Sequence, residues 1–161
     1  MNITVSKIER ANYDNLVSIY ERQRQYHYNI AEQQYKGDFE KVSIEDFKRY
    51  TKSANELVLV VEDEDRQESD YIGFLAIHEM RIYEEDIAFI DDLFVDKEYR
   101  CNNIGILLLQ NAISWVREIG LKRIYVQVIK GNESALRFYE RYDFHLQKCN
   151  NQVYQLYRDL D

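Results

Sequence analysis

The connection between one apolar strand-like run and the helix-like run after it constrains this chain more than any other feature. The stretch from Phe94 to Leu109 reads FVDKEYRCNNIGILLL. A loop that leads from the carboxyl end of a strand into a helix presents free backbone N–H groups and the positive end of the helix dipole, which together attract phosphates. Arg100 adds a positive charge, and Gly105 lets a ligand approach the backbone. This pattern predicts a pyrophosphate cradle; in the plainer alternative, Asn103 is only a helix cap and Arg100 only a surface residue.

The rest of the chain alternates between strand and helix patterns, as expected for a mixed α/β fold. Strand patterns are predicted over residues 2–8, 56–62, 70–80, 86–95, 122–129 and 152–160, and helix patterns over 11–30, 43–50, 104–120 and 132–144. Ser43 and Asp46 look like the cap and N3 acid of the second helix, Gly120 ends the third and Asn132 caps the fourth. The three strands from 56 to 95 are expected to be consecutive and antiparallel. We therefore predict a single domain over residues 1–161, built around one central sheet.

Composition narrows the function classes. The chain has 161 residues and a net charge of -8, from 29 acidic and 21 basic residues, which argues against nucleic-acid binding and favours a cationic substrate. No run is long enough to span a membrane and no signal-peptide pattern precedes the first strand, so a cytoplasmic location is expected. The two cysteines, Cys101 and Cys149, are expected to stay reduced, and no cysteine or histidine cluster predicts a metal.

The stretch Asp91 to Phe144 resembles the N-acetyltransferase (GNAT) superfamily. Its acetyl-CoA signature has Arg or Gln, two residues, Gly, one residue, then Gly or Ala, and Arg100, Asn103 and Gly105 stand in these positions, with Cys101 where a glycine is frequent. A second motif, from Asn132 to Phe144, resembles the family's later motif, in which an asparagine caps a short helix. Asn132 caps that helix, Tyr139 follows seven residues later, and Phe144 leads into the next strand, with an aspartate where a glycine is customary.

The resemblance implies a GNAT-like, mostly antiparallel mixed sheet flanked by helices, in which splayed central strands form the acetyl-CoA cleft. Acetyl-CoA is the implied co-substrate, with no metal. The implied cofactor contacts come from the strand end, the loop with its helix start, and the later helix cap. These residues are Leu93, Phe94, Val95, Arg100, Cys101, Asn102, Asn103, Ile104, Gly105, Ile106 and Asn132.

Acetyl transfer to an amine needs a polarised thioester carbonyl, a neutral amine and a protonated leaving thiol. By resemblance, a backbone N–H between Leu93 and Val95 meets the carbonyl, and the Tyr139 phenol is the general acid; alternatively, Tyr139 is a core aromatic residue. Strand alternation puts Asp91 on one face with Phe89 and Leu93, and Asp92 on the other with Ile90 and Phe94. By resemblance to polyamine acetyltransferases, whose corresponding stretch also begins with an acidic pair, Asp91 is the first candidate for base or amine anchor and Asp92 the second; each has the alternative of a structural, paired carboxylate.

In the family that the chain resembles, the first two helices and the loop between them usually form the wall of the acceptor site. That wall is predicted to include Tyr20, Tyr26, His27 and Tyr28, which suit a cationic amine. None of the three histidines is assigned a catalytic role. The expected acceptor is a small cationic amine such as a polyamine, and a peptide or protein amino group is the alternative. A non-catalytic acyl-CoA-binding sensor remains open as another class, and a homodimer is compatible with the aromatic residues of the last strand.

Overall fold

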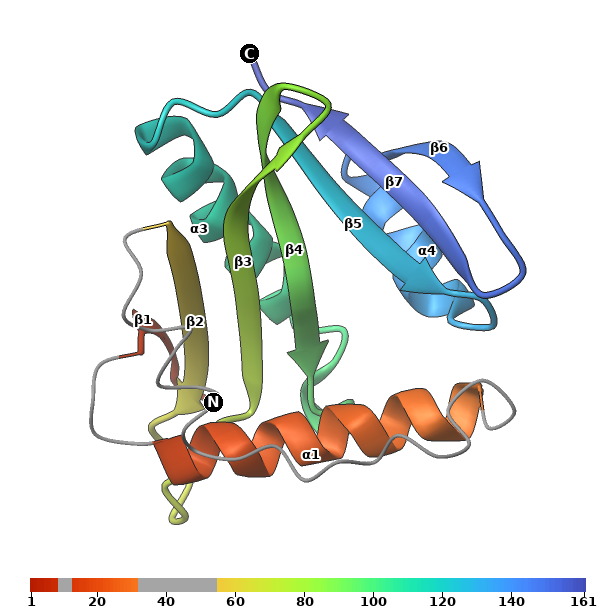
Figure 1. The fold of residues 1–161 in the computed structure, drawn as a ribbon. Helices are drawn as coiled ribbons and strands as arrows, with labels where there is room; N and C mark the ends of the chain where they lie inside the picture. The colour runs from red at the N-terminus through yellow and green to blue at the C-terminus, as the bar shows by residue number, and fades with distance from the viewer. Residues whose placement is uncertain (9–12, 32–54) are drawn as a thin grey trace.

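The computed structural model describes residues 1–8, 13–31 and 55–161, and a seven-stranded sheet organises them (Figure 1). The strands are β1 (Ile3–Lys7), β2 (Glu56–Asp63), β3 (Gly73–Ile82), β4 (Glu85–Val95), β5 (Arg123–Ile129), β6 (His145–Cys149) and β7 (Val153–Asp159). Their spatial order is β1-β2-β3-β4-β5-β7-β6. Within this sheet β4 and β5 run parallel, and the other neighbouring pairs are antiparallel.

Helices cover the two faces of the sheet. Helix α1 (Tyr13–Ile30) packs on one face, and α3 (Ile104–Glu118) packs on the other against β2, β3 and β4. Neighbouring residues of β3 show this division, because Phe74 belongs to the apolar cluster under α1 and Leu75 to the larger cluster under α3. Helix α4 (Glu133–Arg141) contributes to that larger cluster, and the short 3-10 helix η1 (Lys97–Tyr99) follows β4.

Most predicted elements are present. The mixed sheet, the three consecutive antiparallel strands β2 to β4, and helices α1, α3 and α4 are confirmed. The Asn132 side chain accepts a hydrogen bond from the Ala135 N–H and so caps α4, and Gly120 follows the end of α3 with a φ of 81°. The predicted helix over 43–50, with its Ser43 and Asp46, lies outside the described residues. Strand β6 was not predicted, because its five residues are all exposed and carry no alternating pattern.

Among the residues that the structure describes, none of the helices has both the length and the apolar character that a membrane span requires.

Strand β4 contains an extra residue at Asp91. Ala76 pairs with Asp92 and Ile77 pairs with Ile90, so Asp91 has no partner on β3 and forms a β-bulge. Ile90 consequently joins the cluster under α3, whereas Phe94 joins the cluster under α1. The prediction that Asp92 shares a face with both of them is wrong, because the inserted residue shifts the strand alternation by one.

The bulge brings two carboxylates to one face of the sheet. Asp91 hydrogen-bonds His78, which alternates along β3 with Phe74 and therefore points to the α1 side. Asp92 hydrogen-bonds the side chain of Gln23 on α1. The prediction that Asp91 and Asp92 lie on opposite faces is therefore also wrong.

Strands β4 and β5 separate directly before the bulge. Their ladder runs from Ala88 with Ile124 to Ile90 with Val126 and then ends, and the strands diverge toward α1 (Figure 1). The rest of β4 stays paired with β3 as far as Val95 with Gly73. The predicted splay is confirmed, and it starts within the two strands rather than beyond them.

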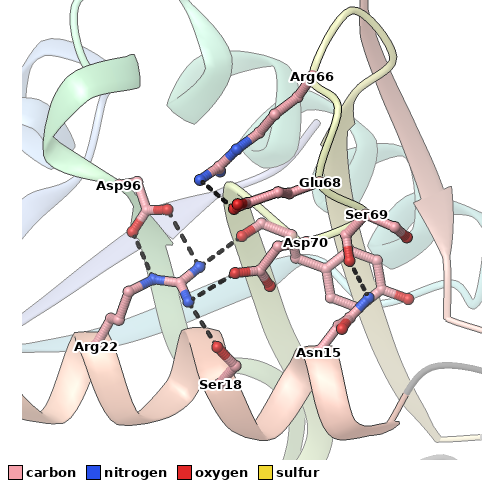
Figure 2. A network of polar contacts seen from close by, with 9 residues as sticks. Asn15, Ser18, Arg22, Arg66, Glu68, Ser69, Asp70 and Asp96 are labelled. Atoms are coloured by element: carbon pink, nitrogen blue, oxygen red, sulfur yellow. Dashed lines mark hydrogen bonds and ion pairs between the residues drawn. The ribbon is translucent and has the colours of Figure 1, made fainter.

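A guanidinium network holds α1 in place under this opening (Figure 2). Arg22 donates from Nε and Nη2 to the two carboxylate oxygens of Asp96, at 3.0 and 3.2 Å, directly after β4. It also donates to Asp70 at 3.1 Å and to the Tyr71 carbonyl at 2.6 Å, both before β3, and to Ser18 one turn earlier on α1 at 2.7 Å. The helix is thereby tied to the segments that lead into β3 and out of β4.

Removing this guanidinium should destabilise the fold. Arg22→Ala leaves two partly buried carboxylates without their cation, and we expect the free energy of unfolding to fall by about 2 kcal/mol in urea denaturation. Arg81→Ala is the matched control, because its ion pair with Asp86 is exposed in the β3–β4 hairpin and should matter by about 0.5 kcal/mol or less. Equal effects of the two substitutions would contradict the assigned role of Arg22.

Candidate functional site: two cavities that meet at Tyr139

The loop between η1 and α3 curls as an anion cradle should. Cys101 and Asn103 have positive φ angles of 64° and 62°, the left-handed conformation that glycine adopts most easily. The first hydrogen bond of α3 runs from the Leu107 N–H to the Asn103 carbonyl, so the N–H groups of the first turn point out of the helix end. The Asn102 side chain braces the loop by donating to the Tyr99 and Arg100 carbonyls at 3.1 Å.

Arg100 points back toward the sheet. Its Nε donates to the Val95 carbonyl at 2.8 Å, and its guanidinium lies 4.3 Å from the ring centre of Tyr26 on α1. The side chain therefore fixes the end of β4 against α1 while it contributes to the cavity beside the loop. Arg100 thus supplies the positive charge that was predicted at the loop, and its contacts with Val95 and Tyr26 fix the position of the guanidinium.

A first cavity of about 360 Å³ opens beside this loop. Its walls come from the end of β4, the loop, the start of α3 and one side of α4. They include all the predicted cofactor contacts except Asn102, namely Leu93, Phe94, Val95, Arg100, Cys101, Asn103, Ile104, Gly105, Ile106 and Asn132.

Helix α4 adds cations to this cavity that were not predicted. Arg137 and Arg141, one turn apart, line it together with Ser134. The spacing of these two arginines on the polar side of a predicted helix was the sequence signal that could have identified them.

Gly105 leaves room for helix α4 as well as for a ligand, because a Cβ added at this position would lie 3.2 Å from the Phe138 ring.

A second cavity of about 390 Å³ lies between α1 and the diverging strands. Tyr20, Gln23 and Arg24 of α1 line it, as do Asp91 and Asp92 of β4. Five residues line both cavities: His27, Leu93, Asn132, Ala135 and Tyr139. The two spaces therefore meet at a common wall between the splayed strands.

The protonation of Asp92 is unusual for a carboxylate. Burial raises its pKa to about 7, the neighbouring Asp91 charge adds to the rise, and a hydrogen bond with Gln23 and the charge of Arg24 oppose it. Gln23 is only 2% exposed, so this partner is fixed inside the protein. A group with such a pKa exchanges a proton readily near neutral pH.

Tyr139 has the opposite character. It is buried, its ring packs edge-on against Phe138 and Phe144, and burial together with the charge of Asp92 raises the pKa of its phenol well above the usual value. The phenol therefore keeps its proton throughout the neutral range. Tyr139 is part of the hydrophobic core, as the alternative of a core aromatic residue states. It also lines both cavities, as the predicted role of general acid requires.

Asp91 is paired on its outer side. His78 donates from Nδ1 to the Asp91 carboxylate over 2.6 Å, and this hydrogen bond raises the pKa of the imidazole. Glu56 lies directly across from His78 on β2, and burial raises the pKa of its carboxyl. Of the two aspartates, Asp92 thus has the environment that raises its pKa toward neutral, and Asp91 has the structural pairing.

The predicted aromatic wall is partly assembled. Tyr20 lines the second cavity, Tyr26 the first and His27 both, whereas Tyr28 lines neither of them. Burial and the Arg100 charge lower the pKa of His27, so its ring is neutral at neutral pH. Gln23 and Arg24 were missed, although they lie between the predicted residues, because polar residues on a helix that face a cavity give no periodic apolar signal.

A model of the acetyltransferase (GNAT) family matches residues 16–144. A probable spermine N(1)-acetyltransferase of Bacillus subtilis subsp. natto is 32% identical over 82 residues, which are 48% of this chain and 54% of that protein. N-alpha-acetyltransferase 60 of Xenopus tropicalis is 40% identical over 62 residues, 37% of this chain and 26% of that protein. The alignment with the spermine enzyme thus spans about half of its length.

Solved structures share the fold. The PaiA N-acetyltransferase of Thermoplasma acidophilum, in complex with coenzyme A, aligns over 99% of both chains with a TM-score of 0.82 and 19% identity. NAA60 of Arabidopsis thaliana, in complex with a bisubstrate analogue, aligns over 99% of both chains with a TM-score of 0.73 and 18% identity. At these identities the likeness concerns the fold alone.

The cradle conformation can be tested through stability. Cys101→Gly should raise the free energy of unfolding by about 1 kcal/mol, because the positive φ at this position costs an ordinary side chain about that much. Cys149→Gly, at an equally exposed cysteine in β6, should lower it by about 0.5 kcal/mol because glycine weakens a strand. Urea denaturation of both variants measures this, and destabilisation by Cys101→Gly would show that the loop is not held in this conformation.

Proposed function

Because this chain belongs to the acetyltransferase (GNAT) family, we propose that it is an acetyl-CoA-dependent N-acetyltransferase whose acceptor is a small cationic amine. The observation that carries the proposal is the meeting of two cavities at Tyr139, with Asp92 beside it in the second one. A donor held in the first cavity and an amine held in the second would react at this shared wall. A sensor that only binds the donor has no use for the second cavity or for a carboxylate poised to exchange protons.

The residues of the first cavity fit acetyl-CoA. The curled loop offers backbone N–H groups at a helix start for a diphosphate, and Arg137 and Arg141 supply charge for further phosphate. The inner edge of β4 from Leu93 to Val95 has no β5 partner, so its backbone, apart from the Val95 carbonyl that accepts from Arg100, is open to an extended ligand between the strands. When bound there, acetyl-CoA supplies the acetyl thioester.

Asp92 is assigned the role of base. An amine arrives protonated and must lose a proton before its lone pair can attack, and a carboxylate with a pKa of about 7 takes up that proton better than an ordinary aspartate. Asp91, predicted first for this role, is assigned to the amine's surroundings instead, since its carboxylate is already bound to His78.

Tyr139 is assigned the role of acid toward the leaving sulfur. The Asp92 charge contributes to the raised pKa of the phenol, so uptake of the amine proton by Asp92 removes that contribution. The phenol then becomes more acidic when the sulfur needs its proton. The two groups are thereby coupled: the base makes its partner a better acid.

The preference for a small cation rests on the lining of the second cavity. Asp91 and Asp92 supply negative charge, and Tyr20 and Phe89 supply rings against which a cation can lie. The likeness to a spermine acetyltransferase supports this choice. A peptide amino group is the second candidate, supported by the likeness to N-alpha-acetyltransferase 60.

The base should be visible in the pH dependence of the rate. Only ionised Asp92 accepts the proton, so kcat/KM with spermidine is expected to fall as the pH drops below about 7 and to level off above it. Asp92→Asn should lower the rate about 100-fold and remove this limb. A limb that persists unchanged in Asp92→Asn would assign it to another group.

The acid should be visible in turnover rather than in binding. Tyr139→Phe keeps the ring in the core and removes only the hydroxyl, so we expect kcat to fall about 100-fold with a nearly unchanged KM for acetyl-CoA. Tyr142→Phe, on the same helix and also lining the first cavity, is the matched control and should leave kcat within about twofold. Full activity of Tyr139→Phe would exclude the proposed acid.

A further inference from the structure

The bulge places on one face of the sheet two charges that a regular strand would separate. In a regular strand, neighbouring side chains point to opposite faces, but Asp91 and Asp92 both point to the α1 side. Two carboxylates on adjacent residues of one face repel each other, and the Asp91 charge makes Asp92 hold its proton more tightly. The ionisation of Asp92 therefore depends on the charge that Asp91 presents.

The effect of the Asp91 charge depends on His78, which lies on β3. His78 binds the Asp91 carboxylate at 2.6 Å, and the two side chains are 28% and 31% exposed, so the pair is partly shielded from water. His78 itself faces Asp91 from β4 and Glu56 from β2, and its ring is tilted against that of Phe89, with the ring centres 5.9 Å apart. A protonated imidazole cancels the Asp91 charge, whereas a neutral one leaves it in place.

The groups that face Asp92 come from β4, α1 and α4. Asp91 faces it from its own strand, Gln23 and Arg24 from α1, and Tyr139 from α4 across the splay. Asp91 is in turn hydrogen-bonded to His78, and this hydrogen bond raises the pKa of the imidazole. His27 of α1 lines the same cavity, but burial lowers its pKa and keeps it neutral.

We propose that Asp91 and His78 form a positioning pair that sets the proton affinity of Asp92 and thereby the pH range in which the site accepts an amine. The inference rests on the proposed role of Asp92 as base. It gives His78, which the sequence left without a role, a defined one: the imidazole charge offsets the Asp91 carboxylate and keeps Asp92 ionised at lower pH than it otherwise would be.

The proposal predicts the direction in which each of two substitutions shifts the pKa of Asp92. Asp91→Asn removes the repelling charge, so Asp92 should lose its proton at lower pH. His78→Gln keeps a hydrogen-bonding side chain but removes the compensating cation, so Asp92 should lose its proton at higher pH. Two substitutions at the two ends of one hydrogen bond should thus act in opposite directions, which a general loosening of the structure does not produce.

The test is a carbon-13 NMR titration of the protein with labelled aspartate side chains. The Asp92 resonance is assigned from its loss in Asp92→Asn. We expect its titration midpoint to move down by about one pH unit in Asp91→Asn and up by a smaller amount in His78→Gln. Asp86→Asn removes the same charge from the exposed hairpin end of β4 and should leave the midpoint in place.

A second readout separates this proposal from the proposed function. In spermidine acetylation the acid limb should move in the same two directions as the NMR midpoint, with an unchanged KM for acetyl-CoA. Opposite NMR shifts without any acetyl transfer would sustain the pair and reject the proposed function. Shifts in the same direction, or an Asp91→Asn midpoint equal to that of Asp86→Asn, would overturn the pair; because Asp91 is exposed, Asp91→Asn should fold and decide the question even if His78→Gln does not.

Discussion

The inserted residue in β4 is the constraint on which the rest of the site depends. The β4–β5 ladder stops at Ile90, and Asp91 follows as a residue without a partner on β3. From this point β4 continues along β3 while β5 turns away, which leaves one edge of a central strand open inside the protein. Backbone groups at an unpaired strand edge need hydrogen-bond partners, and an extended ligand between the two strands is suited to supply them.

The same bulge places a carboxylate where it can exchange protons. Asp92 turns toward α1 and its Gln23, and α1 in turn is held by the Arg22 network to the end of β4. Helix, strand end and base are thus one mechanically connected unit. Tyr139 faces this unit from α4, and the mutual influence of its phenol and the Asp92 carboxylate links proton uptake on one side of the wall to proton release on the other.

Much of this arrangement is written locally in the sequence. The loop with Arg100 and Asn103, the cap at Asn132 and the element order were predictable because each depends on residues close together in the chain. The bulge was not, because it depends on how β4 pairs with β3, and alternation alone assigned the two aspartates to opposite faces. Gln23 and His78 were missed for a similar reason: their partners Asp92 and Asp91 lie far away in the sequence, and only the folded sheet brings them together.

The measurement that tests the central claim most directly is a calorimetric titration with acetyl-CoA, followed in the same sample by a thiol-release assay with spermidine and with a short peptide that has a free amino terminus. The account predicts saturable binding and release of thiol that requires the amine, with spermidine as the faster acceptor. Binding without release for either amine would contradict the proposed transferase, and absence of binding would show that the loop from Arg100 to Gly105 is only a turn.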